Sequence, residues 1–169
     1  MTPAVLRFTD FFGGKKNQDV GTFPHKNQFE GKLKKEFKDF WLTRLEWSVD
    51  TYIDSLRFTM ADGTVSPKFG NRAFTHNCDF TSPVNKVEAT YRERGLVSLT
   101  FYTDNEELTI QGDGVGKNKS TFELDKGVEN IVQFHLKMGE GRIHGINFGI
   151  MTTPDILSQL QDWLNYTKS

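Results

Sequence analysis

The chain has 169 residues, of which 36% are hydrophobic and 25% charged, and its formal net charge is −1. Without a basic excess it lacks the charge typical of nucleic-acid-binding proteins. The single cysteine, Cys78, excludes an internal disulfide and a zinc site built on cysteine clusters. Fifteen Phe and fifteen Gly indicate strands joined by tight turns, so we expect an all-β protein.

The N-terminal segment predicts neither export nor a membrane anchor. Its first ten residues, MTPAVLRFTD, have no basic start followed by an apolar stretch, which a signal peptide would need. No apolar run anywhere approaches the roughly 20 residues that span a bilayer. We therefore expect a cytoplasmic protein without a membrane span.

Three predicted β-hairpins repeat along the chain. In each, an alternating strand and a short polar loop precede a strand of the pattern aliphatic, any, small, aliphatic, any, Phe. The copies begin 43 and then 47 residues apart. They are IDSLRF at 53–58 after a loop at 50–52, LVSLTF at 96–101 after a loop at 92–95, and IHGINF at 143–148 after a loop at 137–142.

A second repeated feature is a glycine followed ten residues later by Phe. It occurs as Gly13 with Phe23, Gly70 with Phe80 and Gly112 with Phe122. The N-terminal copy has no hairpin before it, and the last hairpin has no such segment after it. One hairpin and the glycine-to-Phe segment that follows it make one repeated unit. We therefore expect the N-terminal segment to complete the third unit. The result would be a closed threefold arrangement with few exposed sheet edges, such as a β-prism or a β-trefoil.

The last seventeen residues differ from the rest and predict a short amphipathic α-helix. Thr153 is a possible cap, Pro154 suits the first helical position, and apolar residues then recur at helical spacing. We divide the chain into a β domain at 1–152 and a helical appendage at 153–169. The apolar stripe either packs on the domain or binds a protein partner through Leu160, Trp163 and Leu164.

Catalytic motifs are not found in the sequence. The four histidines show no H-E-x-x-H spacing, and there is no G-x-S-x-G. The glycine-rich run at 112–116, GDGVG, lacks the Lys-Ser/Thr ending of a phosphate-binding loop. We expect a non-enzymatic protein with no metal and no cofactor.

Three segments of the sequence together resemble the jacalin-related lectins: Phe12-Gly13-Gly14, the expected strand LVSLTFYT at 96–103, and residues 129–150. The likeness covers residues 5–150. It implies a β-prism I fold of three Greek-key sheets. It also implies metal-independent recognition of mannose-like or related glycans, and association into homo-oligomers.

In that family the sugar lies between an N-terminal Gly-Gly loop and the last hairpin loop, which carries a G-x-x-x-D pattern. The resemblance points to Gly13 and Gly14 with Gly139, Gly141, Arg142 and His144. His144 replaces the family Asp and offers one acceptor in place of two carboxylate oxygens.

The repeat supplies a second candidate sugar site in the first unit, where Asp54 is the equivalent of His144. Asp50 and the loop Gly70-Asn71 accompany it, whereas the second unit has Val97 at this position. As an alternative, Asp50 and Asp54 merely complete a hairpin turn. The alternative function is a non-catalytic interaction or structural subunit that kept the fold and lost the sugar site, which His144 and the predicted additional C-terminal helix favour.

Overall fold

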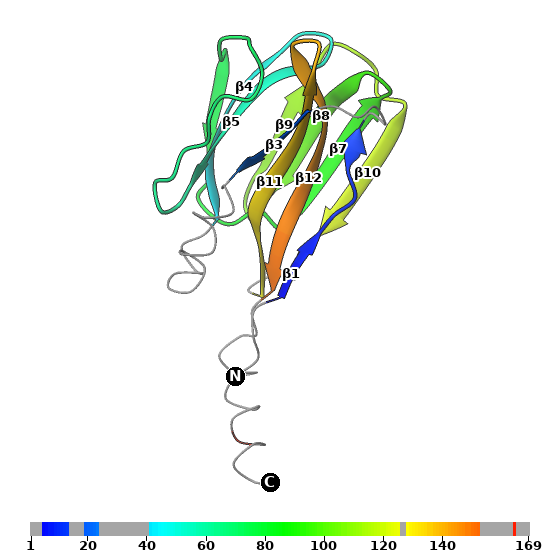
Figure 1. Cartoon of the computed structure of the whole chain (residues 1–169). Helices are drawn as coiled ribbons and strands as arrows, with labels where there is room; N and C mark the ends of the chain where they lie inside the picture. The colour runs from blue at the N-terminus through cyan, green and yellow to red at the C-terminus, as the bar shows by residue number, and fades with distance from the viewer. Residues whose placement is uncertain (1–4, 14–18, 24–40, 126–127, 153–163, 165–169) are drawn as a thin grey trace.

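Three antiparallel sheets form the described part of the protein (Figure 1). The computed structural model describes residues 5–13, 19–23, 41–125, 128–152 and 164. The strands are β1 (Val5–Phe8), β2 (Phe12–Gly13), β3 (Asp19–Phe23), β4 (Leu42–Val49), β5 (Ile53–Met60), β6 (His76–Asp79), β7 (Lys86–Arg92), β8 (Gly95–Tyr102), β9 (Glu107–Gln111), β10 (Asn118–Glu123), β11 (Glu129–Gly139) and β12 (Arg142–Thr152).

Each sheet is centred on one of the three predicted hairpins. The orders are β10-β7-β8-β9, β5-β4-β6 and β1-β12-β11-β3, with β2 also paired to β12. The first order is that of a Greek key, in which the fourth strand returns beside the first. In the second sheet, bridges from Val65 and Phe69 to β5 take the place of the remaining strand. The third sheet draws β1, β2 and β3 from the N-terminus, which confirms that this segment completes the last unit.

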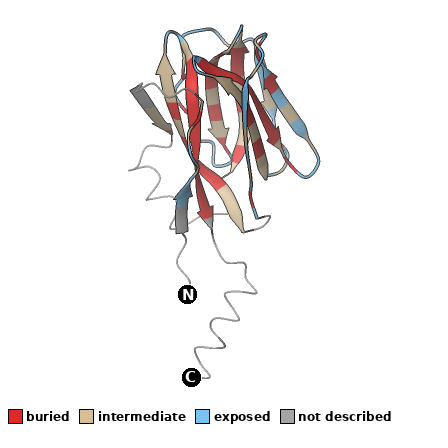
Figure 2. Ribbon diagram, turned by 90° about the vertical axis from the view of Figure 1, so that its right-hand side faces the viewer, coloured by how far each residue is buried: buried red, intermediate tan, exposed pale blue. Residues whose placement is uncertain are grey.

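The repeated Phe position forms the centre of the core. Phe58, Phe101 and Phe148 are each 0% exposed. The Phe134 ring stacks on Phe58 at 4.1 Å between centroids and meets Phe148 edge-on at 5.8 Å, so aromatic contacts join two of the sheets. Buried residues accordingly line the inside of the sheets in Figure 2. Threefold repetition therefore explains much of the unusual Phe content.

The third hairpin turn is shorter than the loop predicted at 137–142. β11 continues to Gly139 and β12 begins at Arg142, which leaves only Glu140 and Gly141 in the turn. Both have positive φ, 53° and 75°, as a two-residue type I′ turn requires. Sustained pairing of two eleven-residue strands thus overrides the polar composition that suggested a longer loop.

Two further expectations concern helices. Of the predicted helix at 153–169, only Leu164 falls within the described residues, so the helix stays a prediction. Across the part of the chain that the structure describes, no helix is long and apolar enough to cross a membrane.

Candidate carbohydrate-binding site

The three hairpin turns gather at one end of the prism, away from the start of β1 and the end of β12 (Figure 1). The ring of Tyr52 in the β4–β5 turn lies against Gly95 of the β7–β8 hairpin, where an added Cβ would be 3.0 Å from it. The same Cβ would be 3.2 Å from the Ile143 carbonyl of the β11–β12 hairpin. Residues from all three units therefore pack closely against one another at this end.

Every hairpin carries a β-bulge at the equivalent place. The pairing passes from Ser48–Ser55 to Val49–Ile53, which leaves Asp54 as the extra residue of its strand. The same shift leaves Val97 extra in β8 and His144 extra in β12. A bulge redirects the extra side chain and strengthens the local twist, and bulges are common beside functional sites.

A repeated glycine packs on the backbone of each bulge. An added Cβ on Gly13 would overlap the His144 carbonyl oxygen, and one on Gly70 would overlap that of Asp54. The Gly112 amide donates a 2.8 Å hydrogen bond to the Val97 carbonyl. The predicted equivalence of these three glycines, and of the bulge residues they touch, is thus confirmed.

Asp54 in the first unit presents a partly accessible carboxylate. Its side chain is 15% exposed, and Arg72 Nη1 donates a 2.9 Å hydrogen bond to Oδ2. The same Arg72 atom lies 3.3 Å from Asp50 Oδ2, so one guanidinium bridges both predicted acidic residues. Gly70 has φ +96° and Asn71 beside it is exposed. The structure therefore brings together all four candidates of this unit.

Burial raises the pKa of the Asp54 carboxyl above its ordinary value. The charge of Arg72 opposes this shift, the charge of Asp50 adds to it, and the hydrogen bond from Arg72 and the charge of Arg142 also lower the pKa. Desolvation is the largest of these effects, because the side chain is only 15% exposed. The Asp54 carboxyl is consequently harder to ionise than an ordinary aspartate.

The last hairpin has a different character. His144 is 1% exposed, so its imidazole is not presented at the surface. Arg142 Nη2 donates to Glu140 at 2.7 Å, and its guanidinium lies 4.6 Å above the Tyr52 ring of the first unit. Gly139 pairs with Arg142, and the exposed Gly141 completes the turn. Of the predicted N-terminal loop, Gly13 is in place with φ +132°, while Gly14 lies outside the described residues.

Arg72 and the bulges are the parts of the site that sequence reasoning missed. Arg72 lies eighteen residues after Asp54 and belongs to no repeated pattern. The bulges did leave a signal, because the apolar positions of each copy are spaced three and then two apart. A regular strand would keep the spacing at two, so one residue must be extra.

Comparison with known proteins identifies the architecture. Neither a protein-family model nor a curated protein matches the sequence. Among solved structures, the wild-type Malaysian banana lectin aligns with a TM-score of 0.66 at 13% identity, over 88% of this chain and all of its own. A mannose-binding jacalin-related lectin from Ananas comosus gives 0.65 at 17% identity, over 88% of this chain and 99% of that one. Artocarpin in complex with mannotriose gives 0.62 at 16% identity, covering 86% and 97%. The chain therefore has the jacalin-like β-prism fold of the jacalin-related lectins.

Proposed function

We propose that the protein is a non-catalytic lectin that recognises neutral, mannose-like or related glycans without a metal ion, through the loops at the hairpin end. The observation that carries the proposal is the carboxylate of Asp54 on a bulge that is closely covered by Gly70. A carboxylate accepts charge-assisted hydrogen bonds from two sugar hydroxyls, and a glycine lets a sugar approach the backbone closely.

The first unit is the stronger of the two candidate sites. Asp54 is partly exposed, whereas the side chain of His144 is buried. Asp50, Asp54, Gly70 and Asn71 form the first site. The second comprises Gly13, Gly14, Gly139, Gly141, Arg142 and His144.

Sugar binding at the first site requires Arg72 to move from Asp54 or to share it. Its side chain is 56% exposed, and ion pairs of such exposed groups contribute only about 0–1 kcal/mol. The side chain is thus free to turn toward solvent at small cost, or to donate to a sugar hydroxyl.

A titration of isotopically labelled protein with methyl α-mannoside, followed by amide chemical shifts, tests the proposal. We expect millimolar binding that shifts the amides around Asp54 and Gly70, and a loss of at least tenfold in affinity in Asp54→Asn. The matched control is Asp79→Asn, because Asp79 is also a carboxylate paired with an arginine, Arg44, at 3.0 Å in the same sheet. Asp79 is paired with Arg44 near the start of β4, whereas Asp54 lies opposite the other end of that strand, so this variant should bind like the wild type.

The bridge from Arg72 to both carboxylates favours a second function, that of an interaction or structural subunit without sugar binding. In that case the arginine merely ties the hairpin. The variant Arg72→Ala distinguishes the two functions, because it removes the side chain that pairs with Asp54 and leaves the carboxylate accessible to a sugar. Absence of binding to mannosides and galactosides at millimolar concentration, in both the wild type and Arg72→Ala, would refute the lectin proposal.

A further inference from the structure

A cavity of about 580 Å³ lies at the hairpin end, between the first and second units, and plays no part in the sites above. Its volume lies within the roughly 300–1,000 Å³ of small-molecule sites. Its walls come from the β4–β5 turn, the β7–β8 hairpin and the start of β10. The lining residues are Tyr52, Arg92, Glu93, Arg94, Lys117 and Asn118.

Backbone pairing holds these walls in place. Asn118 pairs with Tyr91 in the β10–β7 register, and the Lys117 amide donates to the Tyr91 carbonyl at 3.1 Å. The loop before β10 is tied to the β4–β5 turn, because the Asp113 and Gly114 amides donate to the carbonyls of residues 50 and 51 at 2.7 and 3.0 Å. The cavity is therefore built by three elements that are far apart in the sequence and hydrogen-bonded together.

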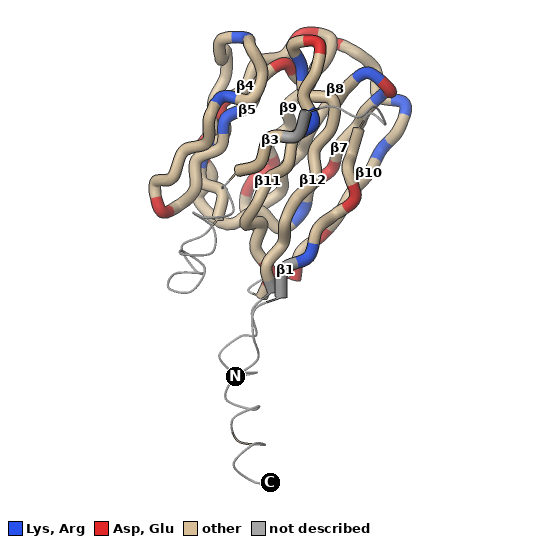
Figure 3. The backbone as a smooth tube through the Cα atoms, viewed as in Figure 1, with Lys and Arg blue, Asp and Glu red and all other residues tan. Residues whose placement is uncertain are grey.

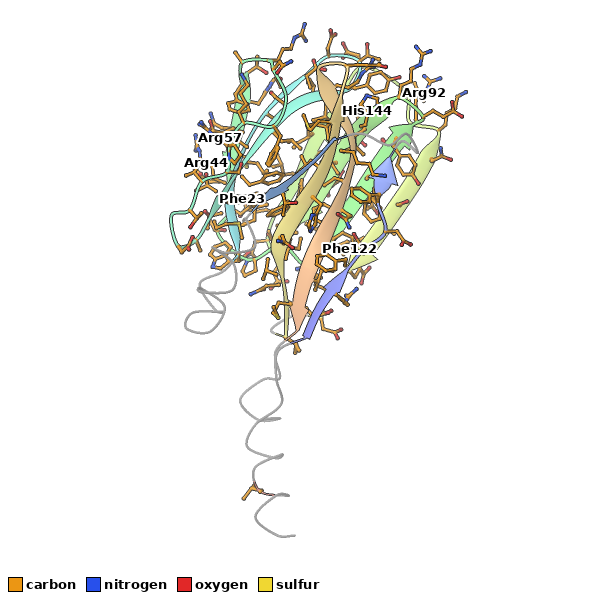
Figure 4. All side chains as sticks on the ribbon, in the orientation of Figure 1. Phe23, Arg44, Arg57, Arg92, Phe122 and His144 are labelled. Carbon is orange, nitrogen blue, oxygen red and sulfur yellow. The ribbon has the colours of Figure 1, made fainter. Side chains whose placement is uncertain are left out.

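The charges around the cavity are unbalanced. The lining contains three basic residues, Arg92, Arg94 and Lys117, and one acidic residue, Glu93. Among the described residues, these three cations form no ion pair. By contrast, each of the other described arginines has a carboxylate oxygen within 3.0 Å; these are Arg7, Arg44, Arg57, Arg72 and Arg142. Figure 3 shows the basic residues at this corner near β7, and Figure 4 places Arg92 there, on the other side of the prism from Arg44 and Arg57.

We propose that this cavity binds an anionic saccharide, with its sulfate or carboxylate group held by Arg92, Arg94 and Lys117. Guanidinium groups bind such oxyanions through paired N–H donors. The Asn118 amide and the Tyr52 hydroxyl supply uncharged partners for ring hydroxyls. Val97 at the bulge of the second unit offers no acceptor for a neutral sugar, and the net charge of −1 disfavours long polyanions. This site is independent of the neutral-sugar function proposed for Asp54.

The test is a chemical-shift titration with a sulfated disaccharide, its unsulfated counterpart and sodium sulfate, at fixed ionic strength. We expect the sulfated disaccharide to shift the amides at 92–95 and 117–118, and to bind more tightly than sulfate alone. The variant Arg92→Gln/Arg94→Gln should lose about tenfold in affinity, which corresponds to two partly exposed charge contacts. Glu93→Gln should bind about twofold more tightly, because it removes the one opposing charge.

The matched control is Arg7→Gln/Arg44→Gln, which removes the same charge away from the cavity and should bind like the wild type. Equal weakening in this control would overturn the proposal in favour of a non-specific effect of net charge. So would equal binding of the unsulfated disaccharide, or shifts confined to other parts of the protein. Failure of mannoside binding to respond to Asp54→Asn would leave this result unchanged, so the two proposals fail separately.

Discussion

Replacing Gly70 by alanine should disrupt the first unit for two separable reasons. The residue has φ +96°, and its added Cβ would lie 2.9 Å from the Ser55 Cα and overlap the Asp54 carbonyl oxygen. The left-handed conformation costs an L-residue about 1–2 kcal/mol, partly offset by about 0.4–1 kcal/mol from the stiffer unfolded chain. Displacing the backbone that the Cβ meets adds about 1–3 kcal/mol, as overpacking does. We expect Gly70→Ala to lower the free energy of unfolding by about 2–4 kcal/mol.

Two other glycines isolate the two terms. Gly63 has φ +90° and nothing within 4 Å of an added Cβ, so Gly63→Ala should cost about 1 kcal/mol from conformation alone. Gly112 does not have a left-handed φ, and its Cβ would lie 2.5 Å from the Thr51 carbonyl oxygen, so Gly112→Ala should cost about 1–3 kcal/mol from contact, less the same offset of about 0.4–1 kcal/mol.

Urea denaturation of the three variants, followed by tryptophan fluorescence and circular dichroism, measures these free energies. We expect Gly70→Ala to lower the free energy of unfolding by more than either of the others, and by approximately the sum of their two effects. Equal costs for Gly70→Ala and Gly63→Ala would show that the close approach to Asp54 carries no energy, and would refute the argument.

Three further predictions concern single side chains. Burial lowers the pKa of His135, whose Nδ1 is hydrogen-bonded to the Thr22 hydroxyl at 3.0 Å. The contribution of neutral His135 to stability is therefore lost as the pH falls from the ordinary histidine range through the lowered pKa. Urea titrations between pH 7 and 5 should show a steeper loss in the wild type than in His135→Gln, and parallel curves would contradict this. Glu140 has φ 53°, which Asn adopts more readily, so Glu140→Asn should raise stability by about 0.5 kcal/mol even though the Arg142 ion pair is lost; an unchanged or lower melting temperature would count against it. Burial raises the pKa of Asp54, so mannoside affinity should decline with falling pH at a higher pH than for an ordinary aspartate, and a pH-independent affinity would exclude Asp54 as the acceptor.

The repeated residues made the architecture predictable. Phe58, Phe101 and Phe148 recur at a fixed place in each hairpin and are all fully buried. In a closed threefold prism, the equivalent position of each sheet is buried in the same core. The residue type at that position therefore repeats along the sequence. Gly13 and Gly70 were predictable for the same reason, because any side chain there would overlap the bulge backbone.

The third turn and Arg72 were not predictable in this way. Whether residues 137–142 pair or form a loop depends on the partner strand, and polar composition alone does not decide it. Arg72 contacts Asp54 only because the chain after Gly70 folds back over the first hairpin. A repeated sequence pattern gives no information about a contact that an exposed side chain makes in only one of the three units.

The residue pattern alone is sufficient to derive an all-β protein with three equivalent hairpins, the closure of the last unit by the N-terminus, and the equivalence of Asp54, Val97 and His144. These follow because periodicity and glycine placement reflect local backbone geometry. The accessibility of these three positions depends on how the three units pack together. The same packing brings Tyr52, Arg92 and Lys117 to one cavity. Contacts between units are set by packing across the symmetry axis, and no repeated motif encodes them.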